Sequence, residues 1–248
     1  MFTHGTLLLF SLSGLFLPPA CSRIPHSPSP CPWKCIRFVQ MWPGSFCVAL
    51  QQKFQCVLPP GSNSWTIHGL WPNKVQNCCG CWRLFRSDLG DLSPLLDQHW
   101  PTFLNLSNIH FWQEEWWKHG TCAACLETLS SPSKFFGAAL KLREVFNIDR
   151  AFQRAGIVPT CSHSYQLDSL QAALKPVLGE ENELQCATDG QGREVLVQVQ
   201  VSLFQNLSRA CKASGPPDGT VSPYHRCRAQ APILFVPPDP ARPRDPCP

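Results

Sequence analysis

The sequence predicts an α+β domain in which a central, mainly antiparallel sheet packs against several helices and disulfides stabilise the fold. Three observations lead to this class. Segments with strand periodicity and segments with helical periodicity follow one another without strict β–α alternation. Hydrophobic residues make up 44% of the 248 residues, which is enough for a sizeable core. The 15 cysteines indicate disulfides formed in an oxidising compartment.

The first residues indicate export. Leu7 to Leu17 form an apolar run that is too short to span a membrane. Small residues follow Pro18-Pro19, as expected of a cleavage site between Ala20 and Ser22. We therefore expect a signal peptide over residues 1–21. A buried N-terminal helix is the alternative, which the two prolines disfavour.

Composition also changes beyond this segment. Residues 22–32 are rich in Pro and Ser and predict an unstructured leader, and residues 239–248 predict a loose Pro-rich tail. One domain is expected over residues 33–238, because no linker separates two cores. No other long apolar run predicts a membrane span. We expect a monomer that is secreted, or that resides in the lysosome or the lumen of the endoplasmic reticulum.

Three segments have the character of strands. Ile36 to Trp42 is predicted to form a strand that is ended by Pro43, and Trp65 to Leu70 lies between turn-forming residues and Pro72. From Val195 to Leu203, apolar and polar residues alternate, which predicts a half-buried strand.

Helices are predicted between the second and the third of these strands. Residues 94–104 and 110–119 suggest two helices joined by a loop, and Lys134 to Phe146 has apolar residues at helical spacing. Asp149 to Gly156 has an Asp cap and a Gly stop, and Asp168 to Leu174 is followed by Pro176, which we expect to end it.

Two sequons, at Asn105-Leu-Ser107 and Asn206-Leu-Ser208, are also consistent with export, and glycans are expected at both asparagines. The net charge is only +4, and no dense Lys/Arg run is present. That balance permits binding of a polyanion without demonstrating it.

Glu115, Lys118 and His119 follow one another at i, i+3 and i+4, so we expect them on one helical face. A histidine accepts a proton near neutral pH, a lysine neutralises a phosphoryl oxygen, and a carboxylate orients the histidine. An ordinary surface Glu/Lys pair is the alternative, but Trp112, Trp116 and Trp117 already cover much of this surface, so the polar cluster needs a reason.

His68 lies in the second strand, where Trp65, Ile67, Gly69 and Trp71 alternate with it. A lone histidine in a strand is usually a satisfied core residue. Together with the Glu115/Lys118/His119 cluster, it supplies the second of two histidines, one acid and one base. Cleavage of an RNA phosphodiester by its own 2′-hydroxyl requires such a pair.

The two segments, WTIHGLWP at 65–72 and FWxxEWxKHGTC at 111–122, closely resemble the active-site segments of the ribonuclease T2 family. The resemblance extends to Val39–Pro43 and to Phe235–Pro238, and therefore covers about residues 33–238. It implies a ribonuclease T2-like domain.

The resemblance implies a role for each residue. His119 corresponds to the general base for the 2′-hydroxyl, His68 to the general acid for the leaving 5′-oxygen, and Glu115 and Lys118 to the pair that stabilises the charged phosphorus. The expected reaction is metal-independent endonucleolytic cleavage of single-stranded RNA through a 2′,3′-cyclic phosphate to 3′-phosphate ends. DNA is expected to be inert, and no cofactor or metal is implied.

Base binding follows in the same way. Trp71 and Phe111 resemble the aromatic walls of the base pocket, although Phe111 is as well explained by core packing. Many relatives carry an aspartate where this chain has Asn73, so base preference is open. A second departure is Glu114, which occupies the position of a histidine that contacts phosphate in many relatives; His110, one turn earlier, is a candidate substitute.

The cysteines exceed the family framework. By resemblance, three pairs are expected: Cys47–Cys56, Cys78–Cys122 and Cys186–Cys227. Cys211 occupies a familiar position without its usual partner, and the extra cysteines are Cys31, Cys35, Cys79, Cys81, Cys125, Cys161 and Cys247. A zinc site at Cys78, Cys79, Cys81, Cys122 and Cys125 is one explanation. A bridge from Cys125 to Cys79 or Cys81 is preferred.

Two other functions compete with an endoribonuclease. Glu114 motivates an extracellular RNA-binding or signalling protein that keeps the fold but has weak catalysis. A disulfide-rich structural or inhibitor protein is the third possibility, but it leaves the cluster of Glu115, Lys118 and His119 unexplained.

Overall fold

The computed structural model describes residues 30–50, 54–59, 61–212 and 223–248. The expected signal peptide and residues 22–29 of the expected leader lie outside the described residues. Among the described residues, no helix is both long and apolar enough to cross a membrane.

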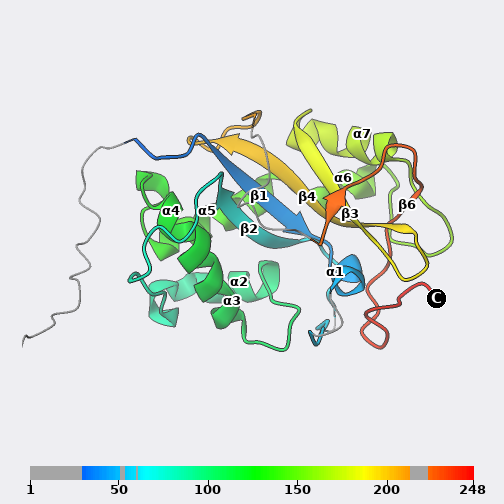
Figure 1. Cartoon of the computed structure of the whole chain (residues 1–248), viewed down its shortest axis with the longest axis horizontal. Helices are drawn as coiled ribbons and strands as arrows, with labels where there is room; N and C mark the ends of the chain where they lie inside the picture. Colours follow the sequence, from blue (N-terminus) through cyan, green and yellow to red (C-terminus); the bar gives the residue numbers. More distant parts are fainter. Residues whose placement is uncertain (1–29, 51–53, 60, 213–222) are drawn as a thin grey trace, which may run out of the picture.

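A single sheet organises the domain. Its strands are β1 (Cys35–Met41), β2 (Thr66–Pro72), β3 (Asn182–Thr188), β4 (Glu194–Phe204), β5 (His225–Arg226) and β6 (Ile233–Leu234). The order is β2-β1-β4-β3-β5 with antiparallel pairing, and β6 joins β4 in parallel. The expected α+β class with a mainly antiparallel sheet and disulfides is confirmed (Figure 1).

The helices lie around this sheet. They are α1 (Pro43–Ala49), α2 (Ser93–His99), α3 (Asn108–Glu115), α4 (Thr121–Ala123), α5 (Pro132–Val145), α6 (Ile148–Arg154) and α7 (Leu167–Leu178), with a π-helical turn at Trp116–Gly120 and 3₁₀ turns at Arg86–Asp88, Gly90–Leu92 and Glu127–Leu129. In Figure 1, α2 to α5 gather at the β2 end of the sheet, and α7 lies toward β3.

The strand register divides the sheet into two different faces. Phe38 pairs with Leu70 and Val201, and all three belong to the main hydrophobic core. The neighbouring residue, Arg37, pairs with Trp71 and Ser202. Because cross-strand partners point to the same side of a sheet, Trp71 lies on the face opposite the main core.

Strand β4 differs from the half-buried strand that alternation predicted. It lies between β1 and β3, and almost all of its residues are buried. Its core-facing side packs into the main cluster, while Val195 and Val197 pack with Leu234 and Val236 on the other side. A central strand covered on both faces buries even its polar positions, such as Gln198 and Gln200.

Two helix boundaries also differ from those that the sequence predicted. The first predicted helix ends at His99 rather than at residue 104, because Pro101 disfavours helical geometry in the residue before it. The cap of α6 is Asn147, whose side chain accepts from the Arg150 amide, and not Asp149.

Pro176 does not end α7, which continues to Leu178. Leu174 and Leu178 are both buried in the main core, and this burial outweighs the hydrogen bond that the proline removes in the last turn. Gly179, at φ +86°, ends the helix instead.

Six disulfides join described residues: Cys31–Cys125, Cys35–Cys211, Cys47–Cys56, Cys78–Cys122, Cys161–Cys247 and Cys186–Cys227. Three of these are the pairs implied by resemblance. The preferred bridge from Cys125 to Cys79 or Cys81 is wrong, because Cys125 bonds Cys31.

The last residues are not a loose tail. Cys247 is buried and bonded to Cys161, and its carbonyl accepts a hydrogen bond from the Arg193 guanidinium at 2.6 Å. The Arg244 guanidinium donates to the Leu50 carbonyl at 2.7 Å. These contacts fix the Pro-rich segment against the domain.

Candidate active site

A β-bulge places His68 on the face that also holds Trp71. Val39 pairs with Gly69 and Gln40 pairs with Ile67, so His68 is the extra residue of β2. Simple alternation predicted His68 on the side opposite Trp71. The bulge turns it instead, and its ring meets the Trp71 ring edge-on at a centroid distance of 4.9 Å.

His68 is held at one ring nitrogen by the sheet. Its Nδ1 lies 2.9 Å from the Gln198 Oε1 on β4, so Nδ1 is the donor and Nε2 remains for a ligand. The Gln198 amide nitrogen in turn donates to the Gln185 side chain. Burial lowers the pKa of His68 to about 4, and the Gln198 hydrogen bond acts in the opposite direction.

The second segment supplies its side chains from a helix that changes its winding. Helix α3 ends at Glu115, and Trp116–Gly120 forms a π-helical turn. Glu115 and His119 are buried, at 7% and 5% exposure, whereas Lys118 is half-exposed. Glu115 and His119 therefore lie deeper in the structure than Lys118, which reaches solvent from the π turn.

Trp71 connects the two segments. Its indole Nε1 donates to the Glu115 Oε2 at 2.9 Å, and its ring lies 5.5 Å from the His119 ring. His68 and His119 therefore both contact the Trp71 ring. The indole is buried at 9% exposure, so a base would meet only part of this predicted pocket wall.

Gly69 makes this contact possible. A Cβ atom at Gly69 would lie 1.9 Å from the Trp71 Nε1 and 2.5 Å from the Glu115 Oε2. The indole and the carboxylate thus occupy the volume of a side chain. The sequence did not predict a role in the site for Gly69 or Gln198. The only signals were a glycine within one predicted strand and a polar residue within another.

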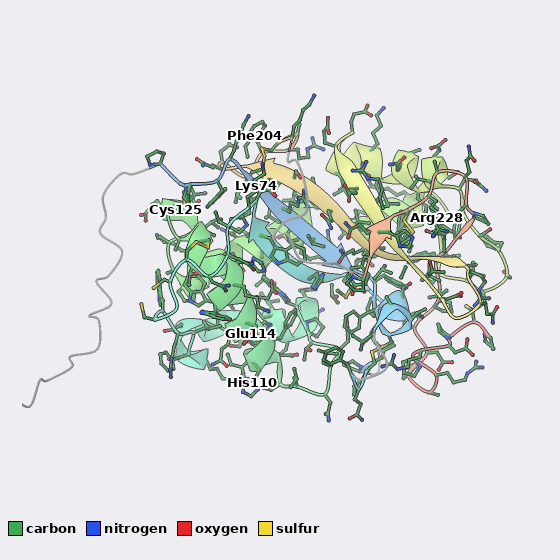
Figure 2. All side chains as sticks on the ribbon, viewed as in Figure 1. Lys74, His110, Glu114, Cys125, Phe204 and Arg228 are labelled. Atoms are coloured by element: carbon green, nitrogen blue, oxygen red, sulfur yellow. A yellow bond between two sulfur atoms is a disulfide. The ribbon has the colours of Figure 1, made fainter. Side chains whose placement is uncertain are left out.

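Lys118 contacts the residue that departs from the family pattern. Its Nζ lies 3.4 Å from the Glu114 Oε2, and both side chains are exposed, at 44% and 58%. Glu114 therefore points toward Lys118 rather than into the buried pair of Glu115 and His119. His110 lies one turn earlier on α3 (Figure 2), where its Nδ1 contacts the Ser107 hydroxyl at 2.9 Å.

The other predicted residues occupy separate places. Asn73 is buried, and its backbone N–H donates to the Cys35 carbonyl at 2.9 Å. Phe111 is half-buried and packs against the main core. The glycosylation candidates Asn105 and Asn206 are exposed. Among the residues that the structure describes, no group of His, Cys, Asp and Glu is arranged to hold a metal ion.

Comparison with known proteins agrees with this geometry. The family model described as "Ribonuclease T2 family" matches residues 33–214. Ribonuclease T2 of Sus scrofa is 36% identical over 180 residues, covering 71% of this chain and 86% of its own. The crystal structure of human RNase T2 superposes with a TM-score of 0.70 at 28% identity, covering 84% of this chain and all of that one. That of RNase NT in complex with 5′-AMP gives 0.69 at 29% identity, covering 83% and 98%.

The chain therefore belongs to the ribonuclease T2 family. The enzyme class that the sequence predicted, a T2-type endoribonuclease, is the class that this family defines.

Gly69→Ala tests the contact between the sheet and the helix. The new methyl group must displace Trp71 and Glu115, and overpacking of this kind costs about 1–3 kcal/mol of the free energy of unfolding. Gly137→Ala in α5 is the matched control, because its Cβ would lie 3.7 Å from the nearest atom. Replacing a glycine within a helix should raise the free energy of unfolding by about 0.5–1 kcal/mol. Denaturant unfolding measures both. Equal stability of the two variants would show that the site tolerates a side chain at Gly69.

Proposed function

We propose that this chain cleaves single-stranded RNA by attack of the ribose 2′-hydroxyl on the adjacent phosphorus. The observation that carries the proposal is that His68 and His119 both contact the Trp71 ring, while Glu115 accepts a hydrogen bond from the same indole. Two imidazoles and a carboxylate around one point are what general acid–base cleavage of a phosphodiester needs.

In this mechanism His119 takes the proton of the 2′-hydroxyl as the oxygen attacks phosphorus. The Nε2 of His68 gives a proton to the departing 5′-oxygen, since its Nδ1 is engaged by Gln198. The product is a 2′,3′-cyclic phosphate. Water then opens it to a 3′-phosphate, with the two histidines exchanging roles.

Glu115 and Lys118 act on the phosphoryl oxygens. Lys118 is half-exposed and its ammonium neutralises charge as it grows on the phosphorane. The buried Glu115 carboxylate, held by Trp71, orients His119 or accepts a hydrogen bond from a protonated non-bridging oxygen of the phosphoryl group. The nucleophile belongs to the substrate, so the mechanism calls for no metal, and DNA lacks the reacting group.

Substrate bases are proposed to bind at Trp71, Asn73 and Phe111. Stacking on an aromatic ring contributes about 1–3 kcal/mol per base and tolerates any base. A monomer that is secreted, or delivered to the lysosome, with glycans at Asn105 and Asn206, is the proposed setting. The disulfides among the described residues support an oxidising compartment.

A weakly catalytic RNA-binding protein is the second candidate function. The ion pair between Glu114 and Lys118 favours it, because a carboxylate at 3.4 Å competes with phosphate for the ammonium. The pair is exposed, so this competition is worth only about 0–1 kcal/mol. That magnitude reduces catalysis without abolishing it, and it makes the enzyme the stronger proposal.

Replacing either histidine tests the assignment of roles. His68→Ala and His119→Ala should each lower kcat/KM on single-stranded RNA by about 10²–10⁴-fold, the usual contribution of one acid–base group. EDTA should leave the wild-type rate unchanged. Substitution of the exposed His163, which contacts Tyr165 away from these elements, is the control. Cleavage that survives in the double variant would rule out both roles.

Gln198 sets the pH dependence through His68. The general acid works only while protonated, so kcat/KM should fall as the pH rises above the pKa of about 4 and be higher at pH 5 than at pH 7. Gln198→Glu places a carboxylate beside Nδ1 and raises the pKa of His68. The limb of the pH–rate profile on which kcat/KM falls with rising pH should then move toward neutral pH by about one unit or more. Gln198→Leu should move it the other way. A limb that stays in place in both variants would contradict the role of His68 as the acid.

Glu114→His discriminates between the enzyme and the weak binder. The substitution removes the partner of Lys118 and adds a group able to contact phosphate. Turnover that rises by about tenfold or more would mean that Glu114 restrains an otherwise competent site. If turnover stays negligible in both proteins while RNA still binds, the binding protein is the better description.

A further inference from the structure

A cavity lies on the outer side of the helical segment that carries Glu115 and His119. Its volume is about 480 Å³, and its walls include Trp82, Phe85, Trp117 and Glu114. We call it the outer pocket. None of Trp71, Asn73 and Phe111 lines it, so it is separate from the base-binding residues proposed above.

The outer pocket presents aromatic surface to solvent. Phe85 is 60% exposed and Trp117 is 40% exposed, which is unusual for two large rings that face the same cavity. Adjacent exposed aromatics mark a binding surface more often than an accident of packing. The site is open enough for a ligand to reach both rings.

The pocket is held in shape by the helix behind it. Trp116 donates from Nε1 to the Trp82 carbonyl at 3.0 Å, and the two rings meet edge-on at 4.9 Å. The Gln113 side chain donates to the Leu84 carbonyl at 3.0 Å. These bonds tie the loop at Gly80–Phe85 to α3 and the π turn, so a ligand meets a preformed cavity.

The charges at the pocket select a neutral ligand. Arg83 and Glu114 supply one charge of each sign, and a phosphate placed here would meet the Glu114 carboxylate. A nucleobase is flat and uncharged, and it stacks on tryptophan and phenylalanine. The chemistry of the walls therefore matches a base and not the backbone of RNA.

The outer pocket also adjoins the proposed reaction site. Glu114, in its wall, lies 3.4 Å from the Lys118 ammonium that is proposed to bind the scissile phosphate. The Glu114 carboxylate is 58% exposed, so it is accessible to hydrogen-bond donors of a ligand in the outer pocket. Guanine offers two adjacent N–H donors, which match a carboxylate that accepts with both oxygens.

We propose that the outer pocket is an additional nucleobase subsite for the RNA chain, with Trp117 and Phe85 as stacking walls and Glu114 favouring guanine. This inference rests on the proposed function for its substrate. It assigns Glu114 a role in selecting substrates, where the family pattern indicated only a missing phosphate contact.

Binding of a 2′-O-methyl RNA hexamer, followed by fluorescence polarisation, tests the subsite without catalysis. Trp117→Ala and Phe85→Ala should each raise Kd by roughly 5- to 100-fold, the loss expected for one stacked base, and Trp117→Tyr should restore most of the affinity. Glu114→Gln should remove a preference for guanine-containing over adenine-containing hexamers. Phe204→Ala is the control, because Phe204 is exposed and lies at the far end of the sheet from Glu114 (Figure 2).

A cleavage assay separates this inference from the proposed function. In Trp117→Ala, the ratio of kcat/KM for an unmodified hexamer to that for a dinucleotide should fall by a similar factor. Wild-type binding that depends on Trp117, without cleavage of any RNA, would leave the subsite standing and reject the enzyme. Variants that bind like Phe204→Ala, with an unchanged ratio, would overturn the subsite.

Discussion

The hydrogen bond from the Trp71 indole to the Glu115 carboxylate is the contact on which the site depends. It joins the edge strand β2 to the end of α3 through two residues that lie 44 positions apart in the chain. A charge-assisted bond in a buried setting is stronger than a neutral one and fixes both partners. His68 and His119 each pack against the same indole, so this bond holds the ring that both imidazoles contact. Gly69 supplies the space in which the bond forms.

The sheet contributes in a different way on each of its faces. One face is covered by the main core, which holds β1, β2 and β4 in place. The other face carries the polar side chains of the site beside a smaller apolar cluster, and the bulge at His68 in β2 brings this histidine to that face. Gln198 then fixes the tautomer of His68 and moderates the effect of burial on its pKa. The sheet, packed on the main core, thus positions a polar site in which His68 has a lowered pKa.

Local patterns in the sequence predicted the strands at Ile36 and Trp65, helix α5 and the membership of His68 and His119 in one site. These features depend on short-range periodicity and on motifs whose residues lie close together in the chain. The bulge at His68 was not predictable, since a one-residue insertion leaves no mark in an alternating pattern. The bridges Cys31–Cys125 and Cys35–Cys211 were also missed, because partners 94 and 176 residues apart are set by the fold. Pro176 misled the prediction of α7, where burial of leucines prevailed over local propensity.

The central claim is that two histidines move protons around a 2′-hydroxyl nucleophile, and the products of one cleavage test it most directly. A defined RNA oligonucleotide incubated near pH 5 and near pH 7 should first give 5′ fragments ending in a 2′,3′-cyclic phosphate. These should then open slowly to 3′-phosphates, with a faster first step at the lower pH because His68 protonates only under acid conditions. Fragments with 5′-phosphate and 3′-hydroxyl ends would contradict the claim, because water and not the ribose would then have attacked phosphorus.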